Sequence, residues 1–466
     1  MSEPTPLSVV KTLWELGQLP ESQLQYLRFD DEPGLPSRFY VRELAAGTIG
    51  AQALMAALIW ADRTGQHQTV DIAVRHALAS FRSEHYVRLN DQLLNQGHHA
   101  LHGLYPTVNR QWMHLHATFD HHREGFLRLL GCEPTRESVA HALQHWHADQ
   151  FETQLAQAGL VGAAVRTTDQ WARHPQAGAL SRLPIMEIQR IGDAPVEAIG
   201  RDQPVERPLS GVRVLDLSRI IAAPVGARAL AQHGADVLAI SAPHLPQVHG
   251  LLMDTGRGKR QAHLDLRKPE DAEKLRALVQ DSDVFLQAYR PGGLAQKDFS
   301  PELLARARPG LVYVTLSAYG HVGPWSTRRG FDSLVQSATG IAHEEGLAAG
   351  LGMPGQLPCQ ALDHATGYLA AWGAMVALRR RSIEGGSWLV RVSLAQTAHW
   401  LRSLGEREQG YSDPDLTNEE IRPWLHAMET SQGRLTAIRP AEQMSLTPAR
   451  FELPSAPTGT HDAVWL

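Results

Sequence analysis

One segment of this sequence occurs twice, and this repeat is the strongest constraint on how the chain can fold. Residues 43–78 align with residues 363–398 at a constant offset of 320 positions, without a gap. Each copy predicts a helix rich in small residues (45–62 and 365–381), a turn containing glycine, and a short strand. Helices rich in alanine can align by chance, but the turn glycine and the strand valine are also in register, which favours a duplication. The identical pairs are Ala45/Ala365, Gly47/Gly367, Ala51/Ala371, Met55/Met375, Ala57/Ala377, Leu58/Leu378, Gly65/Gly385 and Val70/Val390.

Between the two copies the sequence changes character. Residues 101–195 mix strand and helix patterns, which is typical of an α+β arrangement. From residue 212 to residue 316, strand and helix patterns alternate regularly. Repeated β-α units predict parallel strands with helices over both faces, which is a doubly wound sheet. The predicted strands are 212–217, 237–240, 284–288 and 311–316, and the predicted helices are 224–233, 270–280 and 300–308.

These patterns predict an α/β protein made of several parts. The last part carries scattered Pro, Thr and Ser with weak periodicity, so we expect it to lie extended on the body. The expected division is an N-terminal segment (1–40), an α+β half with the first repeat helix (41–200), a linker (201–208), a Rossmann-like half (209–403) and an extended tail (404–466).

The composition argues against several classes of protein. A formal net charge of -5 does not favour a nucleic-acid or membrane-surface partner. Two cysteines, Cys132 and Cys359, cannot form a disulfide framework, which fits a cytoplasmic location. The N-terminus has no basic region followed by an apolar run, and no stretch of 18 apolar residues occurs, so neither a signal peptide nor a membrane span is expected.

The β-α pattern raises the question of a nucleotide site. The turn 218–226 lacks Gly-x-Gly-x-x-Gly, and Ser241 ends the second strand where an NAD site needs an acidic residue. The stretch 255–260, Thr-Gly-Arg-Gly-Lys-Arg, suits an anion but equally an ordinary basic surface turn. The segment 289–293, Tyr-Arg-Pro-Gly-Gly, leaves the carboxyl end of a strand, where open sheets bind ligands, although a plain loop fits the pattern too.

Asp363 stands at the predicted start of the second repeat helix. An aspartate there can cap the helix, or the positive end of the helix dipole can keep it ionised and nucleophilic, and the local pattern does not separate these readings. Histidines gather in the first half, and His114 and His116 share one face of a strand. No Asp, Glu or Cys accompanies them at a fixed spacing, so we expect no metal site.

An ordered series of short motifs runs from about residue 209 to residue 400. It comprises Leu209-Ser-Gly-Val-Arg-Val-Leu-Asp-Leu-Ser-Arg219, an Ala-Pro pair, Leu230-Ala-Gln-His-Gly-Ala-Asp-Val237, Gly256-Arg-Gly-Lys-Arg260 with Leu264-Asp-Leu266, Tyr289-Arg-Pro-Gly292, Tyr319-Gly-His-Val-Gly-Pro324, Gly330-Phe-Asp332, and Asp363 with Gly367. This series resembles the family III CoA-transferases, the group that includes formyl-CoA transferase and carnitine CoA-transferase. Residues 41–200 resemble the later portion of the same family domain, so the chain looks like a tail half followed by a head half.

The resemblance implies an enzyme that moves coenzyme A between an acyl-CoA thioester and a carboxylic acid. Asp363 would be the catalytic carboxylate, forming first an aspartyl anhydride and then an aspartyl-CoA thioester. Acyl-CoA and an organic acid are the implied small-molecule partners, a homodimer is possible, and no cofactor is held permanently. The implied coenzyme A contacts are Ile221, Ala222, Arg257, Gly258, Lys259, Tyr289, Arg290, Tyr319 and Gly320, with the cations on the phosphates and Tyr289 stacked on adenine.

Three positions depart from the family pattern and keep other functions open. Ser241 stands where a glutamate usually closes the second strand, residues 96–99 do not match the Gly-rich loop of formyl-CoA transferase, and Phe331 replaces the histidine that racemases of this fold place before the aspartate. The alternatives are an acyl-CoA isomerase or racemase and a catalytically poor CoA-thioester-binding protein. In the first repeat copy Glu43 stands at the position of Asp363, but too few residues precede it to build a coenzyme A site, so we expect one covalent site per chain.

Overall fold

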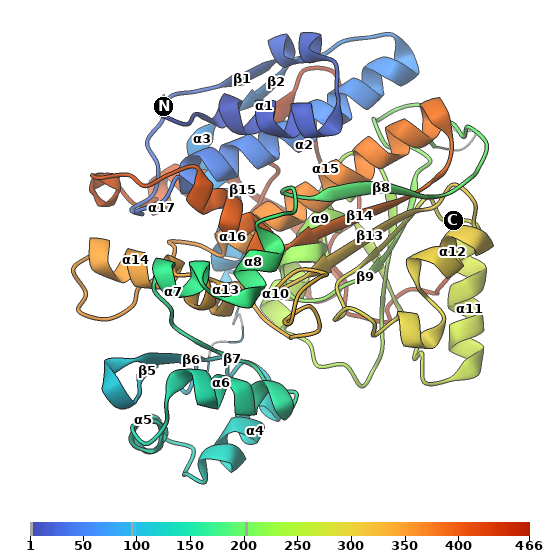
Figure 1. Ribbon diagram of the computed structural model, residues 1–466. Helices are drawn as coiled ribbons and strands as arrows, with labels where there is room; N and C mark the ends of the chain where they lie inside the picture. Colours follow the sequence, from blue (N-terminus) through green and yellow to red (C-terminus); the bar gives the residue numbers. More distant parts are fainter. Residues whose placement is uncertain (1–2, 95–96, 98, 201–203) are drawn as a thin grey trace.

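A seven-stranded sheet forms the centre of the computed structural model, which describes residues 3–466 apart from 95, 96, 98 and 201–203 (Figure 1). The strand order is β11-β10-β9-β12-β13-β14-β8, and every pairing is parallel except that of the edge strand β8. The chain builds the sheet outward in opposite directions from β9, so the order reverses between β9 and β12. The strands are β8 (Glu187–Gly192), β9 (Arg213–Leu217), β10 (Asp236–Ser241), β11 (Lys259–His263), β12 (Val284–Gln287), β13 (Val312–Ser317) and β14 (Ser387–Ser393).

Helices cover both faces of this sheet because successive strand residues point to opposite sides. Val214 and Leu286 belong to the core that contains α9 and α15, whereas their neighbours Leu215 and Phe285 belong to the core that contains α11 and α12. The protein is therefore the mixed α/β type with a large parallel sheet that the alternating pattern predicts. The helices are α9 (Ala222–Ala231), α10 (His249–Thr255), α11 (Pro269–Gln280), α12 (Pro301–Ala307) and α15 (Ala361–Glu384).

The two repeat copies form matching elements. Helices α2 (Val41–Thr64) and α15 both have 24 residues and both are followed by a glycine, Gly65 or Gly385, with positive φ. The two helices pack against each other, and α1 (Pro6–Gly17) packs against α2 (Figure 1). The strands β2 (Val70–Ile72) and β14 follow, and then the helices α3 (Val74–Ser80) and α16 (Leu394–Ser403).

Helix α2 is also the one helix of the described chain whose length and apolar composition would suffice to cross a membrane. In this fold 89% of its apolar stretch is buried inside the protein, so α2 serves as a core helix.

Part of the first half forms a small module at one end of the molecule, far from α2 (Figure 1). Its three strands have a core of their own, which includes Tyr105, Phe126 and Phe151. The module contains β5 (Gly103–Pro106), β6 (Trp112–Leu115), β7 (Gly162–Ala164), α4 (Asp120–Leu130), α5 (Arg136–Leu143) and α6 (Ala148–Gln157). Between the module and the large sheet lie α7 (Thr168–Ala172), α8 (Pro175–Leu180), α13 (Asp332–Ala338) and α14 (Ile341–Ala348) (Figure 1).

The segment 404–466 differs from the expected extended tail because it contains a helix and strands. Helix α17 (Asn418–Ile421) precedes β15 (Leu425–Thr430) and β16 (Gly433–Ile438), which form a hairpin, and β17 (Glu442–Met444) pairs with β2. Strand β16 pairs with β3 (Arg88–Leu89), and β3 pairs in turn with β4 (Gln92–Leu93). These strands are short or half-exposed, and the pairings of β16 with β3 and of β17 with β2 join residues far apart in the sequence, so no strong local pattern marks them. Of the expected linker, residues 201–203 lie outside the described residues.

Candidate functional site

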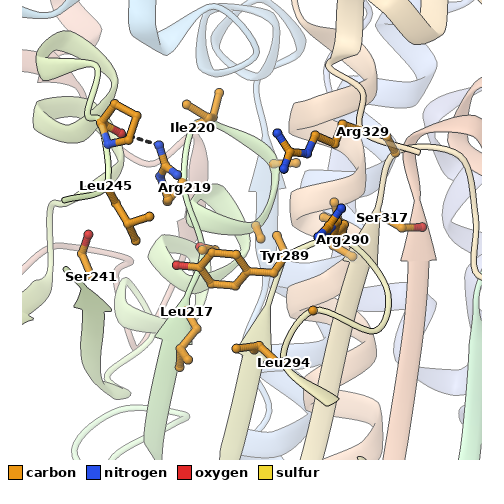
Figure 2. Close-up of a pocket in the computed structure, with 18 of the residues that line it drawn as sticks. Leu217, Arg219, Ile220, Ser241, Leu245, Tyr289, Arg290, Leu294, Ser317 and Arg329 are labelled. Carbon is orange, nitrogen blue, oxygen red and sulfur yellow. Dashed lines mark hydrogen bonds between the residues drawn. The ribbon is translucent and has the colours of Figure 1, made fainter. Parts of the chain in front are cut away.

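A cavity of about 550 Å³ opens at the carboxyl ends of the central parallel strands. Leu217, Ser241, Tyr289 and Ser317 line it from the ends of β9, β10, β12 and β13 (Figure 2). This edge includes the point where the strand order reverses, between β9 and β12. The loops that follow these two neighbouring strands run in opposite directions and create a crevice between them. Open α/β sheets bind ligands in such a crevice.

Asp363 lines this cavity from the first turn of α15 and is 7% exposed. The helix begins at Ala361, so Asp363 is not the capping residue that one reading of the sequence expected. Instead, Asp332 Oδ2 accepts a hydrogen bond from the backbone N–H of Asp363 at 2.8 Å. The carboxylate of Asp332 thus satisfies the start of the helix, and the carboxyl group of Asp363 is left facing the cavity.

The surroundings of Asp363 raise its pKa well above the ordinary value. Burial is the largest cause, followed by the negative charges of Asp332 and Glu84. Burial likewise raises the pKa of Asp332, to about 6. A carboxylate with a raised pKa is a stronger base and a stronger nucleophile once it is ionised, so this environment suits either role.

Five arginines line the same cavity. Arg267 and Arg328 are paired with Asp265 and Glu152. The other three, Arg219, Arg290 and Arg329, face the cavity from the loops around it (Figure 2). Arg219 donates to the carbonyl of Pro246, while its buried Nε has no hydrogen-bond partner among the described residues. Arg290 and Arg329 are exposed, and neither guanidinium group is hydrogen-bonded or ion-paired to a described part of the chain. Burial and the charge of Arg290 lower the pKa of Arg329. The three guanidinium groups form a cationic wall suited to an anionic ligand.

Four of the coenzyme A contacts implied by the family resemblance lie at this cavity together with Asp363. Ile221 and Ala222 stand at the start of α9, and Tyr289 and Arg290 follow β12. The residue before Ile221, Ile220, has a φ of 75°, a strained value for a β-branched side chain. Such strain is concentrated at binding sites, where the surrounding structure holds the backbone in place.

The structure does not bring the basic Gly-rich turn to this cavity, which corrects the expectation for Arg257, Gly258 and Lys259. Lys259 begins β11, is 2% exposed, and donates from Nζ to Asp216 Oδ2 and to the carbonyl of Pro224, both at 2.8 Å. It reaches only a narrow neighbouring space of about 40 Å³.

Arg257 and Gly258 are engaged inside the protein as well. The guanidinium of Arg257 binds Asp254 at 2.6 Å and lies 4.8 Å from the centre of the Phe451 ring. The N–H of Gly258 donates to the carbonyl of Leu453 at 2.8 Å. The sequence reports the charge of this turn but not the C-terminal segment that covers it.

Tyr319 and Gly320 also lie away from the lining of the 550 Å³ cavity. Tyr319 is 2% exposed, its ring meets Trp325 edge-on at 5.0 Å, and its carbonyl accepts a hydrogen bond from Gln176. A Cβ on Gly320 would come within 2.5 Å of Leu180. These two residues therefore dock α8 onto the sheet.

Arg219 and Arg329 are cavity residues that sequence reasoning did not single out. Arg219 is the second residue after β9, and the rule that ligands bind beyond the carboxyl ends of strands could have found it. Arg329 lies near the end of the long loop between β13 and α13, far from the strand end in sequence, so only the folded structure brings it to the cavity.

The histidine-rich strand shows structural contacts. His114 is bonded to Ser337 Oγ at 2.8 Å, and burial lowers its pKa to about 3. The ring of His116 stacks on Phe331 with centroids 3.7 Å apart. No group of three or more His, Cys, Asp or Glu residues within the described ranges is placed to hold a metal ion. Residues 95, 96 and 98, in and beside the segment 96–99 that was compared with the Gly-rich loop, lie outside those ranges.

Comparisons with known proteins find similarity to CoA-transferases. Acetyl-coenzyme A transferase nodX of Hypoxylon pulicicidum is 35% identical over 44% of this chain and 35% of its own length. An acyl-CoA transferase of Gibberella moniliformis is 30% identical over 64% of this chain and 56% of its own length. A CaiB/baiF CoA-transferase family protein of Caenorhabditis elegans is 34% identical over 51% of this chain and 70% of its own length.

Among solved structures, a Mycobacterium tuberculosis protein is 30% identical over 42% of this chain and 56% of its own, with a TM-score of 0.38. The chain thus spans only about a third to just over half of the length of the first two of these curated relatives. The sequence matches CoA-transferase family III over residues 25–200 and again over residues 209–405, which together make up most of the chain. The chain belongs to CoA-transferase family III.

Proposed function

We propose that this protein is a CoA-transferase that moves coenzyme A from an acyl-CoA thioester to a carboxylic acid, with Asp363 as the nucleophile. The observation that carries the proposal is the position of Asp363: a single buried carboxyl group with a raised pKa, open to the cavity at the carboxyl ends of the parallel strands. Relatives named as acetyl-CoA and acyl-CoA transferases support the same class of reaction.

The reaction divides into balanced acyl exchanges. A carboxylate oxygen of Asp363 attacks the thioester carbonyl and the C–S bond breaks. Coenzyme A departs as a thiolate, and the acyl group remains on Asp363 as a mixed anhydride. The thiolate attacks the aspartyl carbonyl, which releases the first acid and leaves an aspartyl-CoA thioester. The incoming acid repeats these steps in reverse order and regenerates Asp363. Each covalent step exchanges bonds of similar energy, which is the benefit of nucleophilic catalysis.

Coenzyme A would lie along the cationic wall of the cavity. Arg290 and Arg329 are the proposed phosphate contacts because they face the cavity without protein partners in the described chain. Tyr289, which lies among these groups in Figure 2, is the proposed stacking partner of the adenine. The position that a racemase of this fold fills with histidine holds Phe331, which has no ionisable group, and this favours transfer over isomerisation.

An exchange assay tests the proposal. The protein is incubated with two acyl-CoA and acid pairs, and new thioesters are separated by chromatography. A transferase produces them only when an acceptor acid is present, an isomerase alters the thioester without an acid, and a binding protein does neither. Asp363→Asn should abolish both the exchange and a hydroxylamine-sensitive CoA adduct. An adduct that persists in Asp363→Asn refutes the assigned nucleophile.

The organisation of the chain is part of the proposal. We interpret the sheet as doubly wound, supported by its strand order, and the two matched ranges as tail and head halves of one family domain with the α2/α15 segment duplicated. A cytoplasmic location is consistent with the free cysteines Cys132 and Cys359. A homodimer remains a proposal, testable by light scattering.

A further inference from the structure

Asp363 also lines a second cavity, which is much smaller, at about 70 Å³. Phe119, Ile221 and Phe331 line both cavities together with Asp363, so the two spaces adjoin at its carboxyl group. If coenzyme A occupies the large cavity and its thioester carbonyl meets Asp363, the acyl group extends into the small cavity.

The size of the small cavity limits the acyl group. A water-sized group needs about 10–15 Å³ of this kind of space, so roughly five such groups fit. Leu251 from α10 and the stacked rings of His116 and Phe331 contribute to its walls. An acyl chain much longer than about four non-hydrogen atoms beyond the carbonyl would have to displace these walls.

The walls of the small cavity are also polar. Glu84 lines it from the first half of the chain and is 3% exposed. Its Oε2 is bonded to His364 Nε2 at 2.9 Å, while Oε1 makes no hydrogen bond within the described residues and lies 3.6 Å from His85 Nε2. This oxygen is itself covered by neighbouring atoms. A ligand hydroxyl group that displaces this cover would supply the hydrogen-bond donor that the oxygen lacks.

The charge of the walls argues against an acidic acyl group. Glu84, Asp332 and Asp363 all line the small cavity. A second carboxylate on the acyl group would be buried beside these three carboxyl groups and would be repelled by those that are ionised. A neutral hydroxyl avoids this repulsion and still donates to Glu84.

We propose that the small cavity is the acyl subsite and that it selects short acyl groups bearing a hydroxyl, such as 3-hydroxybutyryl. This inference rests on the proposed CoA transfer at Asp363 and adds the class of acid. Unsubstituted, dicarboxylic and long-chain acyl groups are the disfavoured classes.

The first test is a substrate panel with the full-length protein. Transfer of coenzyme A from 3-hydroxybutyryl-CoA to isotopically labelled 3-hydroxybutyrate, butyrate, succinate and octanoate is measured as kcat/KM. We expect 3-hydroxybutyrate to exceed each other acid at least tenfold. Equal or better transfer to butyrate, succinate or octanoate overturns the proposal. No exchange with any pair would instead count against CoA transfer itself.

Binding gives a reading that does not depend on turnover. Calorimetry with Asp363→Asn should find 3-hydroxybutyryl-CoA bound about tenfold more tightly than butyryl-CoA or succinyl-CoA. Equal affinities for the three thioesters would contradict selection by the small cavity even if the variant has no transferase activity.

Variants of the walls test the location of the subsite. Leu251→Ala enlarges the small cavity and should raise kcat/KM for octanoate relative to butyrate at least tenfold. Leu252→Ala is the matched control, because Leu252 neighbours Leu251 on α10 but lines only the narrow space beside Lys259. Glu84→Gln should reduce the preference for 3-hydroxybutyrate over butyrate. An octanoate ratio that is unchanged in Leu251→Ala would remove the small cavity from the acyl path.

Discussion

Asp332 and Asp363 form a buried carboxyl pair in which one residue holds the backbone of the other. Asp332 receives the N–H of Asp363 and also the amide of Gln336, whose own oxygen receives the N–H of Leu357. The segment that leads into α15 is therefore held at Leu357 and at Asp363. The same arrangement places a second negative charge close to the nucleophile, which raises the pKa of Asp363.

Removing that charge should shift the pH dependence of the reaction. Asp363 attacks only when ionised, so kcat/KM rises with pH through the raised pKa of the pair. In Asp332→Asn the repulsion is lost, the pKa of Asp363 falls, and the rising limb should move to lower pH. Steady-state kinetics between pH 4 and 9 measure the shift, with the exposed Asp120→Asn as the control. A rising limb of kcat/KM at the same pH in Asp332→Asn as in wild type would mean that Asp332 does not influence the ionisation of Asp363.

Two cations on the same domain should respond differently to truncation. Arg290→Ala removes a group that faces the large cavity and should weaken coenzyme A binding by about 1.5–3 kcal/mol, as expected for a charge-assisted hydrogen bond. Lys259→Ala leaves Asp216 buried without its ion pair and should lower the free energy of unfolding by about 3–5 kcal/mol. Calorimetry with coenzyme A and urea unfolding distinguish the two effects. A larger loss of affinity in folded Lys259→Ala would return Lys259 to the phosphate site.

The sequence pointed to Asp363 at the start of a helix and to Tyr289 and Arg290 after a strand, with the help of the family resemblance. The structure places all three at the large cavity. Lys259 was assigned to a phosphate because a sequence displays charge but not the buried partner, here Asp216, that neutralises it. Glu84 was not singled out, since its contact with His364 joins residues far apart in the chain.

At the scale of elements, α9 and α15 cross at two glycines. A Cβ on Gly226 would lie 2.8 Å from the carbonyl oxygen of Gly367, and a Cβ on Gly367 would lie 2.3 Å from that of Ala222. The absence of side chains at these positions lets the helices approach closely. Gly367 stands one helical turn after Asp363 on the same face, so this contact also sets the position of the nucleophile.

Gly367→Ala should therefore impair catalysis without unfolding the chain. The added methyl group pushes α15 away from α9, and a displacement of about 1 Å at Asp363 should lower kcat about a hundredfold. Gly178→Ala is the control, because no heavy atom lies within 4 Å of a Cβ built there on α8. Circular dichroism checks the fold of both variants. A wild-type kcat in Gly367→Ala would show that the helix crossing tolerates the methyl group.

The elements that the sequence predicted well are those with strong local patterns. Strands β9, β10, β12 and β13 consist of apolar runs between turn residues, and they lie close to their predicted positions. Strand β11 was missed because its polar letters, Lys-Arg-Gln-Ala-His, suggest a surface turn although most of the strand is buried. Strands β15 to β17 are half-exposed or short, and β16 and β17 pair with β3 and β2 far away in the sequence, which a local pattern cannot report.

At the scale of the whole molecule, the two repeat helices present unequal carboxyl groups. Glu43 is 4% exposed and is bonded to Arg42 at 2.9 Å, and it lines neither the 550 Å³ nor the 70 Å³ cavity. We therefore predict one covalent coenzyme A per chain. Intact-protein mass spectrometry after incubation with acyl-CoA should find a single adduct in wild type and in Glu43→Gln, and none in Asp363→Asn. Two adducts per chain, or a peptide carrying the adduct at Glu43, would contradict this assignment.

The packing of α2 against α15 (Figure 1) affects whether the site stays assembled at low protein concentration. Glu84 comes from the first half of the chain and Asp363 from the second, yet both line the same small cavity. Because one polypeptide carries both, their association is unimolecular, with an effective concentration that a tether typically sets in the millimolar range. The contact between the halves is thus independent of how much protein a cell makes. When a cell holds few copies of the protein, a site formed between separate chains would dissociate. The contact between the two halves of this one chain would persist.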